Sequence, residues 1–370
     1  MSPALLPETA SMRQWTHHQE LLVGAFSARC AGGDGSGLAQ FLPPDRTTFF
    51  AYGRQALAEA LRRVGVVAGD AVLVPGFICR DALVSLAALG AVPRFYAVGE
   101  DLTTDRNELE RAARGRARAV VAVNYFGFPQ ELGPFQDCCT AHGVQLIEDN
   151  AHGFLSSAGN KPLGRRGDLG VLSLRKTLAV PNGAAVIDNR PDPPPSEGSV
   201  IYYDSPSSAE WRFRLKAAIK PLIGVVGLPA ARMLSVVREI PTAGAARAFP
   251  THAHEVAAEK SMPQEAFSPM TVRLLSRCNV DAERARRRGL YQWCHKTLAD
   301  VREVRPVFGD LPNGVVPYGY PFLFLGDHRT LITESRRRDL LVQRWPDLPA
   351  VVEPGAPAHY RSIRMVSFLW

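Results

Sequence analysis

Between residues 54 and 190 the sequence alternates two kinds of segment, and this alternation restricts the fold more than any other feature. Segments whose apolar residues recur at helical spacing lie at 54–66, 79–90, 104–115 and 132–143. Short and nearly continuous apolar runs lie at 71–77, 92–98, 117–127 and 144–151. Strands that are apolar on both faces are typical of a parallel sheet covered by helices on both sides. The pattern therefore predicts a three-layer α/β domain with a mostly parallel sheet, in which ligands bind at the carboxyl ends of the strands.

A proline-rich stretch, residues 189–199, interrupts this regularity with four prolines in eleven residues. Such a stretch predicts an exposed loop or a domain junction. We therefore expect a large α/β domain over residues 1–195, a helical insertion or linker over 196–260, and a smaller α+β domain over 261–370.

The segment 209–240 reads as helical, although two prolines interrupt it. Its apolar character and its basic residues are compatible with a helix at a membrane surface. Packing against the protein's own core or a second subunit is the interpretation we favour. Residues 268–301 are predicted to form one or two amphipathic helices, and short strands near 315–326 and 339–352 complete the small domain.

The chain carries a net charge of +7, which favours anionic partners. Much of the positive charge lies in "ERARRRG" (283–289) and "ESRRRDL" (334–340), where acidic residues flank the basic ones at helical spacing. We interpret both runs as solvated helix faces, with a surface for anionic substrates or nucleic acid as the alternative. No nucleic-acid-binding signature accompanies them, so nucleic acid is not an expected partner.

The sequence also predicts a cytoplasmic protein. No apolar run reaches the roughly 18 residues of a membrane helix, and the N-terminal residues lack the order of a secretion signal. The six cysteines show no CxxC spacing, which indicates reduced thiols rather than disulfides or a zinc site.

Tyr52-Gly53-Arg54, immediately ahead of the first predicted helix, is the first candidate for a ligand contact. A glycine there allows the backbone to approach an anion, the free N–H groups of the helix point at it, and Arg54 adds a charged hydrogen bond. An ordinary helix cap is the alternative interpretation.

The strand "VQLIEDNAH" supplies the second candidate, because it ends in Glu148-Asp149 and is followed by His152. A carboxylate at the end of a buried strand is costly unless it is paired, so we expect it to face a cleft and meet a cation such as a protonated heterocyclic nitrogen. His152 would stack on, or hydrogen-bond to, the same ring. A strand-end acid at a helix cap is the alternative.

Lys176 is the third candidate, since it follows the apolar segment "GVLSL". A lysine in apolar surroundings loses its proton more readily and becomes a nucleophile toward carbonyls. A lone lysine after a strand is otherwise a surface residue. Taken together, an anion cradle, an acid for a ring nitrogen and a lysine that forms a Schiff base are what pyridoxal phosphate requires.

In this region the chain resembles the DegT/DnrJ/EryC1/StrS family of fold-type I pyridoxal-phosphate enzymes, the nucleotide-sugar aminotransferases. The resemblance rests on six segments in the family's order: "YGRQAL" (52–57), "GDAVLVPGFI" (69–78), "LGAVPRFYAV" (89–98), "VNYFGFP" (123–129), "HGVQLIEDNAH" (142–152) and "GDLGVLSLRKTLAVPNGAA" (167–185). They cover residues 50–190, about a third of the chain.

The resemblance assigns roles to the candidates. Lys176 would form the Schiff base with the cofactor and then transfer the proton, and Asp149 would pair with the pyridine nitrogen. The phosphate-binding residues would be Gly53, Arg54 and Ser173. His152 stands where the family usually has glutamine, near the ring hydroxyl, and Phe77 is the nearest aromatic residue available to stack on the ring.

The chain departs from the family pattern at several of these positions. Ser173 lies three residues before the lysine, whereas the family serine lies five before it. The usual stacking aromatic aligns with Cys79. The nearest counterpart of the family's N-x-R-M segment, which reaches into the partner subunit's active site, is "SPMTVRLL" (268–275).

The resemblance implies a homodimeric aminotransferase that moves an amino group from glutamate, or a similar donor, to the keto group of a nucleotide-linked sugar. Two alternatives remain open. One keeps the cofactor but carries out a dehydration, an elimination or a condensation. The other is a non-catalytic cofactor-binding or scaffold protein that uses residues 209–240 as its contact surface.

Overall fold

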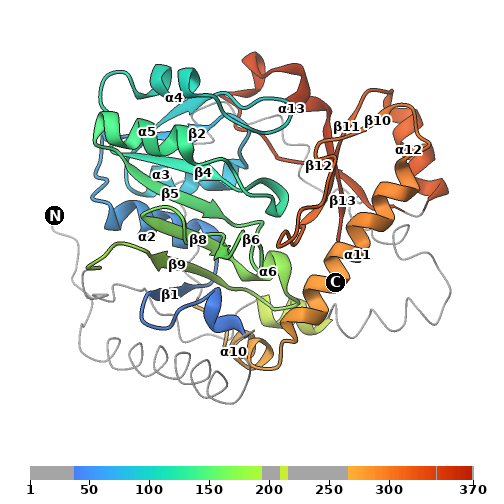
Figure 1. Cartoon of the computed structure of the whole chain (residues 1–370), viewed down its shortest axis with the longest axis horizontal. Helices are drawn as coiled ribbons and strands as arrows, with labels where there is room; N and C mark the ends of the chain where they lie inside the picture. Colours follow the sequence, from blue (N-terminus) through green and yellow to red (C-terminus); the bar gives the residue numbers. More distant parts are fainter. Residues whose placement is uncertain (1–36, 194–208, 216–265, 339, 369–370) are drawn as a thin grey trace.

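The computed structural model describes residues 37–193, 209–215, 266–338 and 340–368 (Figure 1). The helices of the first part lie where the sequence predicts them: α2 (Gly53–Arg63), α3 (Leu83–Ala88), α4 (Arg106–Ala113) and α5 (Gly133–His142). The predicted strands are β2 (Ala71–Pro75), β3 (Val92–Tyr96), β4 (Ala119–Val123) and β5 (Gln145–Asn150). Of the predicted insertion, residues 209–215 are helical and the rest lies outside the described residues, so the contact surface expected at 209–240 stays a prediction.

These strands belong to a seven-stranded sheet with the order β1-β9-β8-β5-β4-β2-β3. Two of its members, β1 (Thr47–Phe50) and β9 (Ala184–Asp188), are not predicted by the sequence pattern, while β8 (Leu169–Ser173) contains the "GVLS" run. Strand β9 is antiparallel to both of its neighbours, β8 and β1, and the other six strands of this sheet share one direction. Since β2, β4, β8 and β9 are buried along their whole length, the sheet is the centre of the large core.

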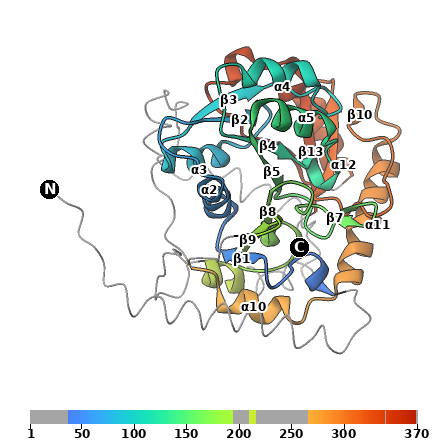
Figure 2. The same ribbon diagram turned by 60° about the vertical axis from the view of Figure 1, so that its left-hand side comes forward.

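Helices cover both faces of the sheet, which makes the large domain three layers thick. Right-handed crossovers place α3, between β2 and β3, on one face. They place α4 and α5 on the other, because the strand order reverses after β3. The contacts agree, since α2 packs with α3 and α4 packs with α5 (Figure 2). The predicted fold class is therefore confirmed.

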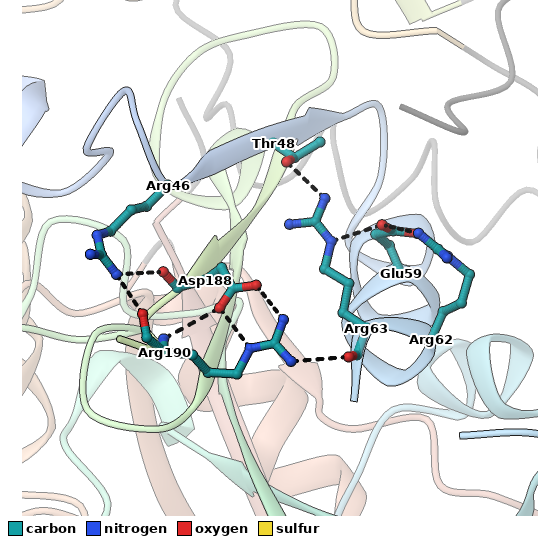
Figure 3. A network of polar contacts seen from close by, with 7 residues as sticks. All are labelled: Arg46, Thr48, Glu59, Arg62, Arg63, Asp188 and Arg190. Carbon is teal, nitrogen blue, oxygen red and sulfur yellow. Dashed lines mark hydrogen bonds and ion pairs between the residues drawn. The ribbon is translucent and has the colours of Figure 1, made fainter. Parts of the chain in front are cut away.

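Hydrogen bonds and ion pairs link the C-terminal end of α2 to the β1–β9 edge of the sheet (Figure 3). Arg63 donates to the carboxylate of Glu59 over 2.8 Å and to the hydroxyl of Thr48 over 2.9 Å. Arg190, paired with Asp188, donates to the carbonyl of Arg63 over 3.1 Å. The network fixes one end of α2, and hence the direction of its N-terminus, which opens onto the carboxyl ends of the parallel strands.

The C-terminal part begins with α10 (Pro269–Leu275) and the long helix α11 (Val280–Leu298), as predicted for 268–301. A second, four-stranded antiparallel sheet follows, with the order β10-β11-β13-β12. Its strands are β10 (Val304–Pro306), β11 (Gly319–Phe324), β12 (Val342–Arg344) and β13 (Ile363–Ser367), and its other helices are α12 (His328–Arg337) and α13 (Ala358–Ser362). This is the predicted smaller α+β unit, and α11 packs on its strand β11.

Helix α10 lies on the large domain rather than on the small sheet. Phe267 and Leu275, at its two ends, belong to an apolar cluster with residues of β1, β8 and β9. The hydroxyl of Thr271 donates to the carbonyl of Asn182 over 2.9 Å, and the side chain of Asn182 accepts from the Ser268 N–H over 2.9 Å. These bonds hold the Pro-Asn-Gly turn that follows Lys176.

Among the helices that the structure describes, none combines the length and the apolar character that crossing a bilayer requires.

Candidate active site

A cavity of about 180 Å³ opens at the carboxyl ends of β4, β5 and β8, beside the N-terminus of α2. Parallel α/β sheets bind ligands at this edge. The volume is slightly above the roughly 150 Å³ that holds a benzene ring in an engineered protein core. Its walls come from residues 52–54, 149–152 and 173–176, joined by Cys79 and Trp345. The structure therefore brings six of the seven candidates together in one cavity.

The N-terminus of α2 forms one side of the cavity. Its first N–H groups have no carbonyl partner within the helix. Gly53 lies beside Ser173, because a Cβ built on the glycine would be 4.0 Å from the Cβ of that serine. The Nε atom of Arg54 is buried and has no hydrogen-bond partner within the described part of the chain, while its Nη1 atom lies 3.4 Å from the carboxylate of Asp81. This donor set suits an anion.

The two acidic residues at the end of β5 lie on opposite faces of the sheet, because successive side chains of a strand point to opposite faces. Glu148 is fully buried away from the cavity, where its carboxylate accepts from the Nε atom of Arg166 over 2.7 Å and from the side-chain amide of Asn124 over 2.9 Å. Asp149 lines the cavity. Burial raises the pKa of Asp149, while the charge of Lys176 and the N–H of Ala151, 2.9 Å away, act in the opposite direction.

His152 also lines the cavity and is held as a neutral imidazole. Its Nδ1 atom accepts from the N–H of Phe126 over 3.3 Å, which leaves the proton on Nε2. Burial, and then the charge of Lys176, lower the pKa of His152 well below its ordinary value. One face of the ring stacks on Tyr318, with the ring centroids 4.5 Å apart and the planes 13° from parallel.

Lys176 lies in α6 (Leu174–Thr177), a single turn that begins where β8 ends. The turn is held from behind, since the carbonyl of Gly183 accepts from the N–H of Leu174 over 2.9 Å. The Nζ atom of Lys176 lies 5.9 Å from the centre of the Tyr318 ring, and its charge acts on Cys79, Asp149 and His152. The lysine thus stands among the groups that the sequence analysis selected.

The predicted role of Phe77 requires a correction. Its ring is fully buried outside the cavity wall, at 5.0 Å from the ring of Tyr360 and 5.5 Å from that of Trp345. The chain turns after β2, and the residues that line the cavity there are Ile78 and Cys79 rather than Phe77. Burial raises the pKa of this thiol, with the charge of Lys176 opposing it.

Sequence reasoning missed the contribution of the C-terminal part. Trp345 lines the cavity and meets His152 edge to face, with the ring centroids 4.6 Å apart. Tyr318 lies behind His152 and over Lys176. Both residues lie far along the chain from the lysine, in segments without a motif, and no local pattern in the sequence points to them.

Residues 36–193 match the sequence profile of the DegT/DnrJ/EryC1/StrS aminotransferase family. This part of the chain, called the family region below, is similar to that family over less than half of the chain's length. It contains α2, the carboxyl ends of β5 and β8, and Lys176, so the family region supplies most of the cavity.

Two relatives of this family region are named for a sugar nucleotide and for a cyclitol. GDP-perosamine synthase from Vibrio cholerae is 30% identical over 154 residues, which are 41% of this chain and 42% of the relative. L-glutamine:scyllo-inosose aminotransferase from Streptomyces griseus is 33% identical over 145 residues, 38% of this chain and 34% of the relative. The chain therefore spans less than half the length of the curated relatives it matches.

The chain shares its fold with solved aminotransferase and dehydratase structures. The Helicobacter pylori aminotransferase involved in the biosynthesis of pseudoaminic acid superimposes with a TM-score of 0.62 over 99% of this chain and 92% of its own, at 17% identity. The Escherichia coli GDP-4-keto-6-deoxy-D-mannose-3-dehydratase, solved with bound hydrated pyridoxal phosphate, gives 0.60 over 99% and 94%, at 11% identity. The fold is that of the fold-type I pyridoxal-phosphate enzymes.

Proposed function

We propose that this protein is a pyridoxal-phosphate-dependent aminotransferase with a keto-sugar as its acceptor. The observation that carries the proposal is that Lys176 and Asp149 face one cavity together with the N-terminus of α2. A fold-type I enzyme needs these three features in one place. The names of the relatives support a sugar or cyclitol acceptor.

The residues present fit pyridoxal phosphate. The phosphate would be held by the first N–H groups of α2, by the adjacent Ser173 and by the buried Nε atom of Arg54, which has no partner among the described residues. Asp149 would keep a proton on the heterocyclic nitrogen, and that cation would offset the cost of burying the carboxylate. When bound, the cofactor would supply an electron sink for the substrate carbon that carries the amino group.

Lys176 would hold the cofactor and, once a substrate amine has taken its place, move a proton within the cavity. His152, neutral and with its hydrogen on Nε2, would donate a hydrogen bond. Trp345 would exclude water from one side of the cavity. The amino donor would be glutamate or a similar amino acid.

The test begins with the visible absorbance of the purified protein after incubation with pyridoxal phosphate. We expect a band that shifts on adding glutamate. Treatment with borohydride fixes the cofactor to the lysine that carries it, and peptide mapping should find the label on Lys176. In K176A both the label and the turnover should disappear, whereas K161A, at an exposed lysine outside this cavity, should behave as wild type. A K176A variant with a normal band and normal turnover would show the assignment to be wrong.

A second candidate is dehydration or elimination on a sugar substrate, and the position of His152 favours it. This residue stands where the family usually has glutamine, and it places an uncharged imidazole in the same cavity as Lys176. Incubating the cofactor-loaded protein with a keto-sugar nucleotide and glutamate separates the two reactions. Transfer of ¹⁵N from glutamate to the sugar supports the aminotransferase, and loss of water from the sugar without that transfer supports the dehydratase.

We further propose a cytoplasmic homodimer that has no nucleic-acid partner and no stable membrane insertion. The five cysteines within the described residues are free thiols, which suits a reducing compartment. Light scattering during gel filtration measures the oligomeric state, and a mass of about 40 kDa, that of one chain, would contradict the dimer.

A further inference from the structure

Three consecutive arginines of α11, residues 286–288, lie in three different environments. Arg286 pairs with Glu283 on its own helix over 2.7 Å. Arg288 donates to the carbonyls of Pro312 and Val315 over 2.7 and 2.8 Å. Arg287 is fully buried, with an exposed fraction of 0%. The interpretation of residues 283–289 as a solvated helix face is therefore wrong at its central arginine.

Arg287 reaches the turn that carries Lys176. Its Nη2 atom donates to the carbonyl of Lys176 over 3.1 Å and to that of Thr177 over 2.6 Å, and its Nε atom donates to the same Thr177 carbonyl over 3.1 Å. The last carbonyls of a helix lack partners within the helix. A cation at this end satisfies them, and it also suits the negative end of the helix dipole.

The same guanidinium holds the segment that leads to Tyr318. Its Nη1 atom donates to the carbonyls of Pro317 and Tyr318, both over 3.2 Å. The ring of Tyr318 in turn stacks on His152 and lies over the Nζ atom of Lys176. One side chain therefore fixes both the backbone of the lysine and the ring that faces it.

Only arginine can make this set of contacts. All three nitrogens of the guanidinium donate hydrogen bonds, and its planar shape fixes their directions. The single ammonium group of a lysine could not reach all of these carbonyls at once. The carboxylate of Glu283, 2.7 Å from Nε, provides the countercharge that a buried cation needs. Glu283 also pairs with Arg286, so it keeps a partner when either arginine is replaced.

We infer that Arg287 is a positioning residue that aligns Lys176 with the cavity by holding the backbone of α6 and of Tyr318 in one frame. The inference rests on the proposed function for its kinetic consequence, but the geometry of the lysine can be tested without the cofactor. It also gives α11, which lies outside the family region, a direct influence on the candidate catalytic residue.

The experiment compares R287M and R287K with R286M, which removes the neighbouring arginine and its bond to the same glutamate without touching α6. In the cofactor-free protein, reductive ¹³C-methylation labels the lysines, and a K176R variant identifies the signal of Lys176. We expect R287M to change the pH midpoint and the chemical shift of this signal, and R286M to leave both as in wild type.

In the cofactor-loaded protein, we expect R287M to lower kcat by about 10- to 100-fold, the scale of a misplacement of about 1 Å, with little change in KM. R287K, which keeps the charge but not the fork, should fall between R287M and wild type, and R286M should match wild type. The visible band of R287M should also titrate at a different pH.

A folded R287M protein whose Lys176 signal and kcat equal those of R286M would overturn the inference. If R287M does not fold, R287M/E283Q removes both charges of the Arg287–Glu283 pair, and R287K retains the charge of Arg287. The same comparison then applies to these variants. If wild type binds no cofactor, the proposed function fails, and the lysine signal alone decides the role of Arg287.

Discussion

The cavity has two walls of different origin. The wall from the large domain consists of the N-terminus of α2 and the ends of β5 and β8, and it carries the charged groups Lys176 and Asp149. The C-terminal part contributes Trp345 as a second wall, with Tyr318 behind His152. The first wall lies inside the family region 36–193 and the second lies outside it. Chemistry and shape are thus encoded in separate parts of the chain, and substitutions in the two walls should have different consequences.

The largest effect is expected for Asp149→Asn, in the first wall. Turnover should fall by about 10²- to 10⁴-fold, because the group that would control the protonation of the ring nitrogen is lost. Stability should be unchanged or slightly higher, since burial raises the pKa of this carboxyl and its charged form is costly to bury. Single-turnover absorbance and urea denaturation measure the two quantities. A large loss of stability would show that Asp149 is a structural residue.

Glu148→Gln, one residue earlier, should lower the stability of the protein and leave cofactor binding unchanged. Its carboxylate is fully buried against Arg166, and breaking a buried ion pair from one side costs about 3 kcal/mol or more. The free energy of unfolding should fall by this amount, while the cofactor band of the protein that remains folded stays as in wild type. Equal stability of Glu148→Gln and wild type in urea would contradict this account of the ion pair.

In the second wall, Trp345→Ala should weaken cofactor binding by about tenfold while leaving the label on Lys176 in place. The free energy of unfolding should fall by about 2 kcal/mol, below the range for a fully buried tryptophan because this one is partly exposed. Trp345→Phe should recover most of both losses. Trp293→Ala, at an indole on α11 that is 49% exposed, is the control and should change stability by about 0.5 kcal/mol or less.

The smallest effect concerns His152, where the two walls meet. Its pKa is lowered in the folded protein, so below its ordinary value of 6.5 the unfolded chain binds a proton that the folded protein does not. The resulting loss of stability begins near pH 6.5 and grows toward the lowered pKa by at most about 1.4 kcal/mol per pH unit. Asp149, whose pKa is raised, has the opposite sign, and it cancels in the difference between wild type and His152→Gln. Melting temperatures from pH 7 to pH 5 should therefore fall less in His152→Gln, and parallel curves would contradict the prediction.

The sequence predicted the first wall well because its residues are tied to local patterns. Gly53 precedes a helix, Asp149 ends a strand and Lys176 follows one, so the carboxyl edge of a parallel sheet brings them together. Phe77 was wrong for an equally local reason. It lies in a turn after β2, where the alternation of strand side chains no longer indicates which residue faces the cavity.

The second wall and its support could not be predicted, because they depend on contacts between distant segments. Arg287 bonds to a carbonyl 110 residues earlier in the chain. A run of arginines flanked by acids looks the same in sequence whether its central member is solvated or buried. The short strand β1 was missed for a related reason, since its four residues are a strand only because β9 returns beside them.

The placement of the two acidic residues on β5 makes this part of the gene intolerant of small insertions and deletions. A shift of β5 by one residue exchanges the faces of all its side chains. Glu148 would then turn toward the cavity face, and Asp149 would turn toward the face on which Glu148 now meets Arg166. We therefore expect that length changes in homologous genes avoid this strand, while they accumulate in the loops beyond the sheet.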